Sequence, residues 1–307
     1  LWRSAGQENP GRRGCRMRAG ASLDELGSSM EAGAGGTANL VRYGQQGRET
    51  LRYKEVPLEK SPVPWRDNGV YWITGGFGGL GRLFVREAAH QARNPVLILS
   101  SRNGGSGQEA FLDELRGLGA RVEAHSLDVA DAAAVRSLAA QILEQHGNLN
   151  GIVHGAGVLQ DGLLMHKQAE SLHKVLSPKI FVLENLDAAT ADLPLDWIVA
   201  CSSISAAWGN PGQSDYAAAN GFMDAFAVYR DGLARQGLRH GRLVSVNWPL
   251  WAEGGMGLTP DGADALGTRT GLRAMPTHGG MQALAAGLAH QYSVFLAAFG
   301  SRGKIRK

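Results

Sequence analysis

The segment VYWITGGFGGLG, residues 70–81, decides the fold of this chain. Its first five residues, Val70–Thr74, are apolar or β-prone and predict a short buried strand. The glycines that follow predict a tight turn into a helix that reaches about Gln91. Glycines at such a turn let the backbone approach a pyrophosphate, whose charge is stabilised by the N–H groups and dipole of the helix start. Residues 70–91 therefore predict a nucleotide-binding unit, although glycines also form ordinary turns.

Strands and helices alternate along the rest of the chain. The predicted strands are 95–100, 121–126, 151–154, 197–201, 243–247 and 293–299, and the predicted helices are 109–117, 131–146, 170–186 and 216–236. Pro178 is expected to kink the helix over 170–186 or to start a new turn, because proline lacks an amide hydrogen. The alternation predicts an α/β fold, a Rossmann-like doubly wound parallel sheet with helices on both faces.

The first 60 residues depart from this pattern. Residues 1–39 are rich in Gly, Ala, Ser and Arg and predict a linker or partly disordered segment. Residues 51–56 alternate in polarity and predict a strand. We therefore expect the 307 residues to divide into an N-terminal segment, 1–60, and one α/β domain, 61–307. The chain starts at Leu1 rather than at a methionine, which indicates a fragment.

Composition and charge argue against several classes of protein. The formal net charge is only +3, and the basic excess lies near the N-terminus, where a solvated linker is favoured over a nucleic-acid site. No apolar run is long enough to span a membrane, and no signal peptide is visible. Cys15 and Cys201 lie in dissimilar settings without metal-binding spacing. We expect no disulfide, a buried free thiol at Cys201, and a reducing cytoplasm.

Residues after the next two strands predict further contacts to the nucleotide. Ser101 and Arg102 follow the strand over 95–100, at a point where NAD-binding sites often carry an acidic residue. A cation there suits the 2′-phosphate of NADPH, and the alternative is an ordinary surface arginine. Asp128, which Val129 follows, is placed to accept a hydrogen bond from the adenine amine or to cap the next helix.

The decisive functional motif is SSISAAWGNPGQSDYAAAN, residues 202–220. Together with the glycine loop, HGAGV at 154–158 and VNWPLWAEGGM at 246–256, it resembles the ketoreductase domains of modular polyketide synthases. The resemblance covers residues 68–307 and implies the short-chain dehydrogenase/reductase fold. It also implies that residues 1–60 contain a remnant of the family's N-terminal structural subdomain. The Pro-Leu-Trp run at 249–251 resembles reductases of trans-acyltransferase assembly lines.

The resemblance implies a catalytic set in which lysine and asparagine exchange sequence positions. Ordinary short-chain dehydrogenases carry Tyr-x-x-x-Lys, but here the residue four positions after Tyr216 is Asn220. Lys179, 24 positions before Ser203, matches the lysine of the ketoreductase family, and Tyr216 lies 13 positions after Ser203. Taken singly, each of the four residues has a purely structural alternative. Tyr216 can pack against the sheet and Ser203 can cap a helix. Lys179 can be a solvated helix lysine, and Asn220 a polar helix residue. Of the two adjacent serines, Ser202 is favoured as the cap.

The roles implied for these four residues follow from the chemistry of a ketone. Tyr216 protonates the carbonyl oxygen, and a nearby cation at Lys179 stabilises the tyrosinate and contacts the nicotinamide ribose. Ser203 donates a hydrogen bond that polarises the carbonyl, and Asn220 holds the lysine or a relay water. The resemblance implies NADPH as cofactor, bound by Thr74, Gly75, Phe77, Gly78, Gly79, Leu80, Ser101, Arg102, Asp128, Val129, Ala156, Gly157 and Pro249.

Two motifs predict opposite product configurations. Leu159-Gln160-Asp161 resembles the Leu-Asp-Asp motif of B-type reductases, with glutamine at the middle position. Trp208 resembles the marker of A-type reductases. The match at Asp161 favours a B-type product with a D-configured hydroxyl. Residues 248–256 resemble the lid of the family, and Met256 there is expected either to touch substrate or to pack.

The resulting prediction is an NADPH-dependent reductase that acts on a β-ketoacyl thioester. The resemblance implies that the substrate is held on the phosphopantetheine arm of an acyl carrier protein, next to other polyketide synthase domains. One alternative is a stand-alone 3-oxoacyl-carrier-protein reductase, which Asn220 disfavours. Another is a non-catalytic scaffold domain, which the complete set of four residues disfavours. No nucleic acid, membrane or metal partner is expected.

Overall fold

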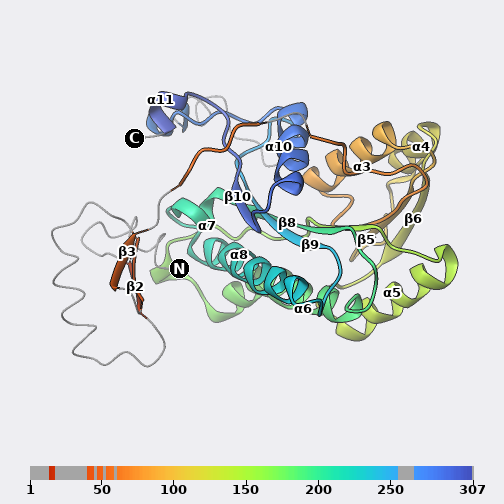
Figure 1. Cartoon of the computed structure of the whole chain (residues 1–307), viewed down its shortest axis with the longest axis horizontal. Coiled ribbons are helices and arrows are strands. Elements are labelled where there is room, and N and C mark those ends of the chain that lie inside the picture. Colours follow the sequence, from red (N-terminus) through yellow and green to blue (C-terminus); the bar gives the residue numbers. More distant parts are fainter. Residues whose placement is uncertain are drawn as a thin grey trace.

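The computed structural model describes residues 14–17, 40–44, 47–50, 53–58, 61–254 and 266–305 (Figure 1). Its main sheet contains seven parallel strands in the order β10-β9-β8-β7-β4-β5-β6. These strands are β4 (Val70–Thr74), β5 (Val96–Ser101), β6 (Arg121–Ser126), β7 (Gly151–His154), β8 (Trp197–Ser203), β9 (Arg242–Trp248) and β10 (Val294–Leu296). The predicted doubly wound sheet is therefore confirmed.

The order of the strands places a crevice next to the predicted nucleotide loop. The chain moves outward from β4 to β6 on one side and from β7 to β10 on the other, so its direction reverses between β4 and β7. In open parallel sheets, ligands bind at the carboxyl ends of the strands at this reversal. Thr74 and His154, the last residues of the two strands, lie side by side there.

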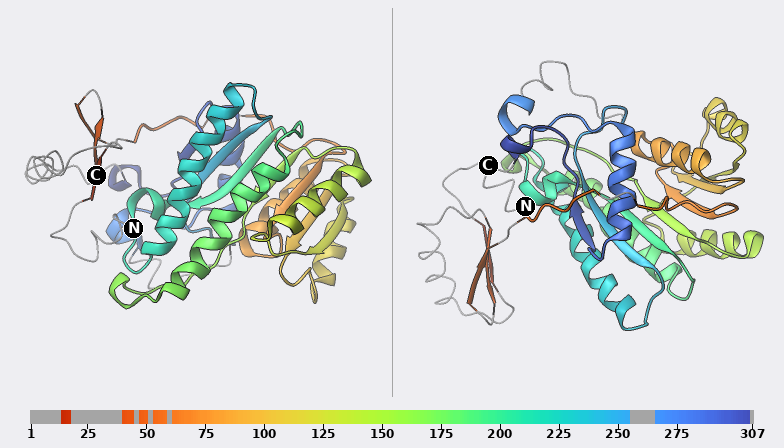
Figure 2. Two further views of the ribbon diagram at one scale, coloured as in Figure 1. Left: turned by 90° about the horizontal axis from the view of Figure 1, so that it is seen from below. Right: turned by 45° about the horizontal axis from the view of Figure 1, so that its top comes forward.

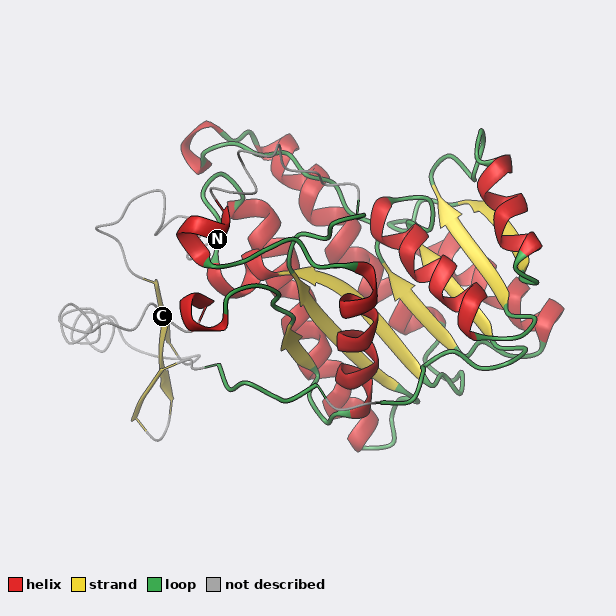
Figure 3. Cartoon of the chain, turned by 90° about the horizontal axis from the view of Figure 1, so that it is seen from above, coloured by secondary structure: helices red, strands yellow, loops and turns green. Residues whose placement is uncertain are grey.

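Helices cover both faces of the sheet. Helices α3, α4 and α10 lie on one face, which Figure 3 shows from above. Helices α5, α6 and α8 lie on the other, which the left panel of Figure 2 shows from below. Their bounds are α3 (Gly79–Gln91), α4 (Glu109–Gly117), α5 (Ala132–His146), α6 (Ala169–Ala189), α8 (Ser214–Arg235) and α10 (Thr277–Ala289).

Strand β4 shows how the sequence builds two cores. Its side chains alternate between the faces of the sheet, as in any strand. Tyr71 and Ile73 join the core under α3, whereas Val70 and Trp72 join the core under α5, α6 and α8. All four side chains are almost completely buried, so β4 lies at the centre of the molecule.

Helix α6 runs without interruption through Pro178, from Ala169 to Ala189. The prediction that a new turn starts at this proline is therefore wrong. Proline removes one backbone donor but fits helical φ, and the buried face of α6 offsets the lost hydrogen bond. That face includes Val175, Val182 and Leu186.

Several elements were not predicted. Helix α10 contains Gly279 and Gly280, which indicate a break in an isolated sequence. In the structure a side chain at Gly280 would overlap the Trp251 ring, so the glycine permits close packing. The short helices α7 (Ile204–Trp208) and α11 (Arg302–Ile305) also carried no clear periodic signal. No helix among the described residues is both long and apolar enough to cross a membrane.

The N-terminal segment contributes a small sheet and a connection to the main domain. Strands β1 (Gly14–Met17), β2 (Leu40–Gly44) and β3 (Gly47–Thr50) form the small sheet. Residues 53–56 have no regular structure, so that part of the strand predicted at 51–56 is wrong. Tyr53 instead donates a hydrogen bond to the Ala207 carbonyl, at 3.1 Å. The domain boundary after residue 60 stays a prediction.

Candidate active site

The glycine loop joins β4 to α3 at the crevice. Gly75 has φ +68°, and a Cβ there would lie 2.8 Å from the Ala156 backbone nitrogen. A Cβ at Gly81 would overlap the Gly75 carbonyl oxygen. Gly78 precedes α3 and provides no side-chain cap, so the first N–H groups of the helix are left for an anion. The loop fits a bound pyrophosphate, and Gly75 and Gly81 leave no room for side chains.

Thr74 and His154 form a buried pair beneath this loop. The Thr74 hydroxyl lies 2.8 Å from Nδ1 of His154, and both side chains are completely buried. Burial lowers the pKa of His154 to about 3, and the charge of Lys179 acts in the same direction. The imidazole is therefore neutral near pH 7 and joins the two strands by a hydrogen bond rather than by charge.

The predicted nucleotide contacts beyond the loop lie at the ends of β5 and β6. Arg102 is exposed directly after β5, and its carbonyl accepts a hydrogen bond from the Ser126 hydroxyl at 2.9 Å. Asp128 is exposed and accepts a hydrogen bond from the Ala130 N–H at 3.0 Å. Asp131, not Asp128, caps α5, so the capping alternative for Asp128 is wrong.

Other predicted nucleotide residues are arranged around the same crevice. Phe77 packs edge-on against Phe111, with ring centroids 6.3 Å apart. Gly79 and Leu80 begin α3, Ser101 ends β5, and Val129 is buried after β6. Pro249 is buried directly after β9.

Lys179 is buried within the candidate catalytic cluster. Its residue exposure is 3 %, and its Nζ donates a hydrogen bond to the Cys201 carbonyl at 3.1 Å. Burial lowers the pKa of Lys179 to about 8, while the Asp224 carboxylate acts in the opposite direction. The Cys201 thiol is free, and burial raises its pKa to about 12, so it is neutral and adds no charge near pH 7.

Tyr216 lies beside this lysine in the first turn of α8. The Lys179 Nζ is 5.5 Å from the centre of the tyrosine ring. Burial raises the pKa of Tyr216, and the adjacent Asn220 and Ser203 side chains oppose the rise. Asn220 donates a hydrogen bond to the Tyr216 carbonyl at 2.7 Å. The four residues predicted to be catalytic thus come together from β8, α6 and α8.

The two serines at the end of β8 have different partners. Ser203 caps α7 by accepting a hydrogen bond from the Ser205 N–H at 3.2 Å, so its capping and catalytic interpretations coexist. Ser202 donates to the Asn220 carbonyl at 3.3 Å and accepts from the Asn247 amide at 3.1 Å. The prediction that Ser202 is the cap is therefore wrong.

A buried polar network behind the cluster was missed by the sequence analysis. Asp224 accepts hydrogen bonds from Ser245 at 2.7 Å and from Asn247 at 2.8 Å. The segment of α8 after Tyr216 also contributes to the core, where Met223 and Ala227 are buried. An acidic residue within such an apolar helix segment was the only available signal for the network.

The predicted stereocontrol residues lie on two separate elements. Asp161 is exposed, and both of its oxygens lie within 3.2 Å of the Gln213 amide nitrogen. Trp208, at the end of α7, packs edge-on against Tyr53, with ring centroids 6.2 Å apart. Met256 lies outside the described residues.

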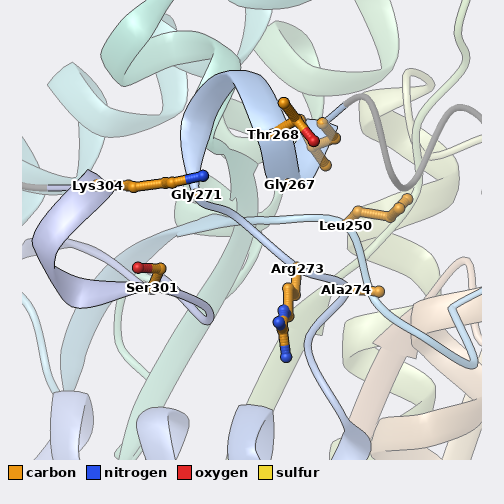
Figure 4. Close-up of a pocket in the computed structure, with 9 residues that line it drawn as sticks. Leu250, Gly267, Thr268, Gly271, Arg273, Ala274, Ser301 and Lys304 are labelled. Carbon is orange, nitrogen blue, oxygen red and sulfur yellow. The ribbon is translucent and has the colours of Figure 1, made fainter.

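A cavity of about 510 Å³ opens beside the segment that follows β9 (Figure 4). Arg273 and Lys304 border it, and Figure 4 shows both side chains with Leu250 among the lining residues. None of the four predicted catalytic residues lines this cavity. It is therefore distinct from the place where Tyr216 and Lys179 meet.

Comparisons with known proteins point to one family. A family model described as the KR domain matches residues 69–253. Two polyketide synthases from Bacillus subtilis (strain 168) are similar: PksN is 45% identical over 252 residues, covering 81% of this chain, and PksL is 38% identical over 312 aligned positions, covering 100%. The chain spans only 5% and 7% of their respective lengths.

A solved structure supports the same assignment. The crystal structure of a ketoreductase domain from the bacillaene assembly line matches 99% of this chain with a TM-score of 0.92 and 36% sequence identity. The match covers 74% of that chain. The matched 99% includes the seven-stranded sheet and both helical layers described above.

Proposed function

The chain belongs to the ketoreductase (KR) domains of polyketide synthases, and from this premise we propose that it reduces a β-ketoacyl thioester to the β-hydroxyacyl thioester with NADPH. Domains of this family bind a nicotinamide cofactor, and the glycine loop at the carboxyl end of β4 fits its pyrophosphate. The observation that carries the proposal is the meeting of Lys179, Ser203, Tyr216 and Asn220 beside that loop.

The reaction places negative charge on the ketone oxygen. When bound, a reduced nicotinamide would supply the hydride for the new C–H bond and be oxidised, while the C=O π pair would move to the oxygen. Ser203 donates a hydrogen bond to that oxygen, and Tyr216 transfers its phenolic proton to it, which completes the hydroxyl group. Solvent returns a proton to Tyr216 after the reaction.

Lys179 makes proton loss from Tyr216 less unfavourable. A phenol with a pKa raised by burial is a poor proton donor, and a cation 5.5 Å from the ring stabilises the phenolate. One of the three N–H bonds of the ammonium is directed to the Cys201 carbonyl. The other two remain for the tyrosinate and the nicotinamide ribose.

We further propose NADPH rather than NADH as the reductant, because Arg102 is exposed at the end of β5, where a 2′-phosphate would lie. Asp161 favours a B-type, D-configured product. The substrate carrier is an acyl carrier protein, and the chain works next to other polyketide synthase domains, in the cytoplasm. The multidomain relatives support this arrangement over a stand-alone reductase.

The test compares wild type with Tyr216→Phe, following NADPH consumption with a β-ketoacyl thioester mimic. We expect kcat to fall by about 10²- to 10⁴-fold, since general acid catalysis is worth that much. Tyr229→Phe is the matched control, because Tyr229 lies on the same helix and is exposed. NADH in place of NADPH and chiral analysis of the product test the two finer proposals.

Two outcomes would count against the proposal. Full turnover by Tyr216→Phe would remove the tyrosine from the mechanism. Tight NADPH binding by wild type without turnover of any β-ketoacyl thioester would favour the non-catalytic scaffold instead.

A further inference from the structure

A buried ion pair includes Asp215, the residue next to Tyr216 of the candidate active site. The Lys167 Nζ is 2.7 Å from Oδ2 of Asp215, and the two side chains are only 3% and 1% exposed. Lys167 precedes α6, and Asp215 is the residue before Tyr216 in α8. No role in hydride or proton transfer falls to either residue.

Each partner also holds a second group. The Lys167 ammonium donates a hydrogen bond to the Gln160 carbonyl, and the Ser171 hydroxyl donates to the Gln160 side-chain oxygen at 2.7 Å. Oδ1 of Asp215 accepts the backbone N–H of Tyr216 at 2.8 Å. A single ion pair therefore connects Gln160 to the backbone of the candidate proton donor.

Two more contacts join the same segments. We define the clamp loop as residues 160–167, which follow β7 and precede α6. The Gly162 N–H donates to the Gly212 carbonyl at 2.9 Å, and Gln213 donates to Asp161. The clamp loop thus contacts residues 212, 213 and 215, immediately before Tyr216.

The free-energy cost of burying two charges favours a positioning role for the ion pair over a stabilising one. Moving two charges out of water is costly, and an apolar pair of similar volume is often as stable or more stable. A buried pair is therefore weak evidence for a stabilising role. Here it fixes the distance between the clamp loop, which carries Asp161, and Tyr216.

We propose that Lys167 and Asp215 are positioning residues that lock the clamp loop onto the first turn of α8 and thereby select which face of the ketone is reduced. The inference rests on the proposed reductase function. When the clamp loop is fixed, Asp161 and Tyr216 flank the substrate on two sides, and their positions relative to each other do not change. With the loop released, the ketone can be presented in either orientation.

The first test is the double variant Lys167→Met/Asp215→Asn, which removes both charges together and keeps an oxygen for the Tyr216 N–H. We expect the minor hydroxyl configuration to increase about tenfold relative to the major one, as for the loss of a modest discriminating contact. We expect kcat to fall about tenfold to hundredfold, because reacting groups are misplaced, while KM for NADPH is unchanged.

Asp187→Asn is the matched control. Asp187 on α6 forms a different buried ion pair, with Arg230 of α8 at 3.1 Å. The same chemical change there lies outside the clamp. It should lower stability without changing the product ratio.

A second variant guards against misfolding of the first. Ser171→Ala removes only the hydrogen bond to the Gln160 side chain, and it should shift the product ratio in the same direction by a smaller factor. An unchanged ratio in a folded double variant overturns the proposal. If the double variant does not fold, an unchanged ratio in Ser171→Ala overturns it.

Amide hydrogen exchange separates this proposal from the proposed reaction. The double variant should speed exchange in peptides covering residues 158–167, whereas Asp187→Asn should not. If wild type reduces no thioester, the reductase proposal fails, but exchange still tests the clamp. Equal exchange in wild type and the double variant would overturn the clamp even if turnover is observed.

Discussion

Lys167, just before α6, and Lys179, within α6, both have buried side chains, but their surroundings differ. Lys167 has the Asp215 carboxylate 2.7 Å from its Nζ. Lys179 donates to a neutral carbonyl, and no ion pair joins it to a carboxylate within the described range 61–254. The first charge is compensated where it lies, whereas the second is not.

This difference separates a fixed charge from a tuned one. Without an adjacent carboxylate, burial lowers the pKa of Lys179 to about 8, close to the working range of a general acid–base site. Asp224 limits this fall from behind the cluster. This contrast agrees with the two proposed roles, chemistry for Lys179 and positioning for Lys167. Substitutions at and around the two lysines can break or sharpen this contrast.

Removal of Lys167 should give the largest effect on stability. Lys167→Met leaves the Asp215 carboxylate buried without its partner, so the free energy of unfolding should fall by about 3–5 kcal/mol. Urea denaturation near neutral pH measures the change. Lys174→Met is the control, because Lys174 and Glu170 form an exposed pair, 56% and 80% exposed, worth less than about 1 kcal/mol. Equal losses in the two variants would contradict the contrast.

Removal of Lys179 should raise the free energy of unfolding near neutral pH, whereas removal of Lys167 should lower it. Below pH 8 the lysine is charged in both the folded and unfolded chain, so Lys179→Met should relieve a burial cost of up to about 3 kcal/mol. Between pH 8 and 10.5 the folded chain releases the proton first, so wild-type stability rises relative to the variant and the gain disappears. Denaturation across this range measures the crossover, and turnover should be lost at every pH.

A pH-independent difference between wild type and Lys179→Met would contradict an uncompensated buried charge. A loss of stability in Lys179→Met near neutral pH would contradict it as well.

Crowding Lys179 should give a smaller effect. A Cβ at Gly157 would lie 2.9 Å from Cε of the lysine, so Gly157→Ala should cost about 1–3 kcal/mol of stability and reduce kcat by displacing the ammonium. Gly232→Ala is the control, because a Cβ there meets nothing within 4 Å and helix propensity should rise. Unchanged kcat in Gly157→Ala would show that the lysine has room to move.

Removal of the exposed Arg102 side chain should have the smallest effect of these substitutions, and it should be confined to the affinity for NADPH. Arg102→Ala should raise KM for NADPH about tenfold, the value of one charge-assisted contact, and leave both KM for NADH and stability nearly unchanged. Arg136→Ala is a control, because Arg136 is exposed on α5. Steady-state kinetics with both cofactors measures the preference, and equal changes for NADPH and NADH would remove Arg102 from phosphate recognition.

The sequence predicted the elements with strong periodic signals. The strand at Val70–Thr74 and the helix at Gly79–Gln91 have the predicted bounds, because apolar spacing and glycine both mark them. Helix α10 was missed because the adjacent Gly279 and Gly280 indicate a break, whereas in the structure Gly280 makes room for the Trp251 ring. A sequence without its tertiary neighbours cannot distinguish a glycine that ends a helix from one that permits close packing.

By itself the sequence determined which functional groups the chain carries and their order along it. A glycine loop follows the first strand of the α/β domain, and Lys179, Ser203, Tyr216 and Asn220 follow at the spacing of the ketoreductase family. Only the tertiary structure decided which buried lysine has a carboxylate beside its charge. It placed Asp215 against Lys167, left Lys179 against a carbonyl, and set Asp224 behind it. The physical reason is that a pKa and an ion pair depend on distances across elements, and spacing along the chain does not specify those distances.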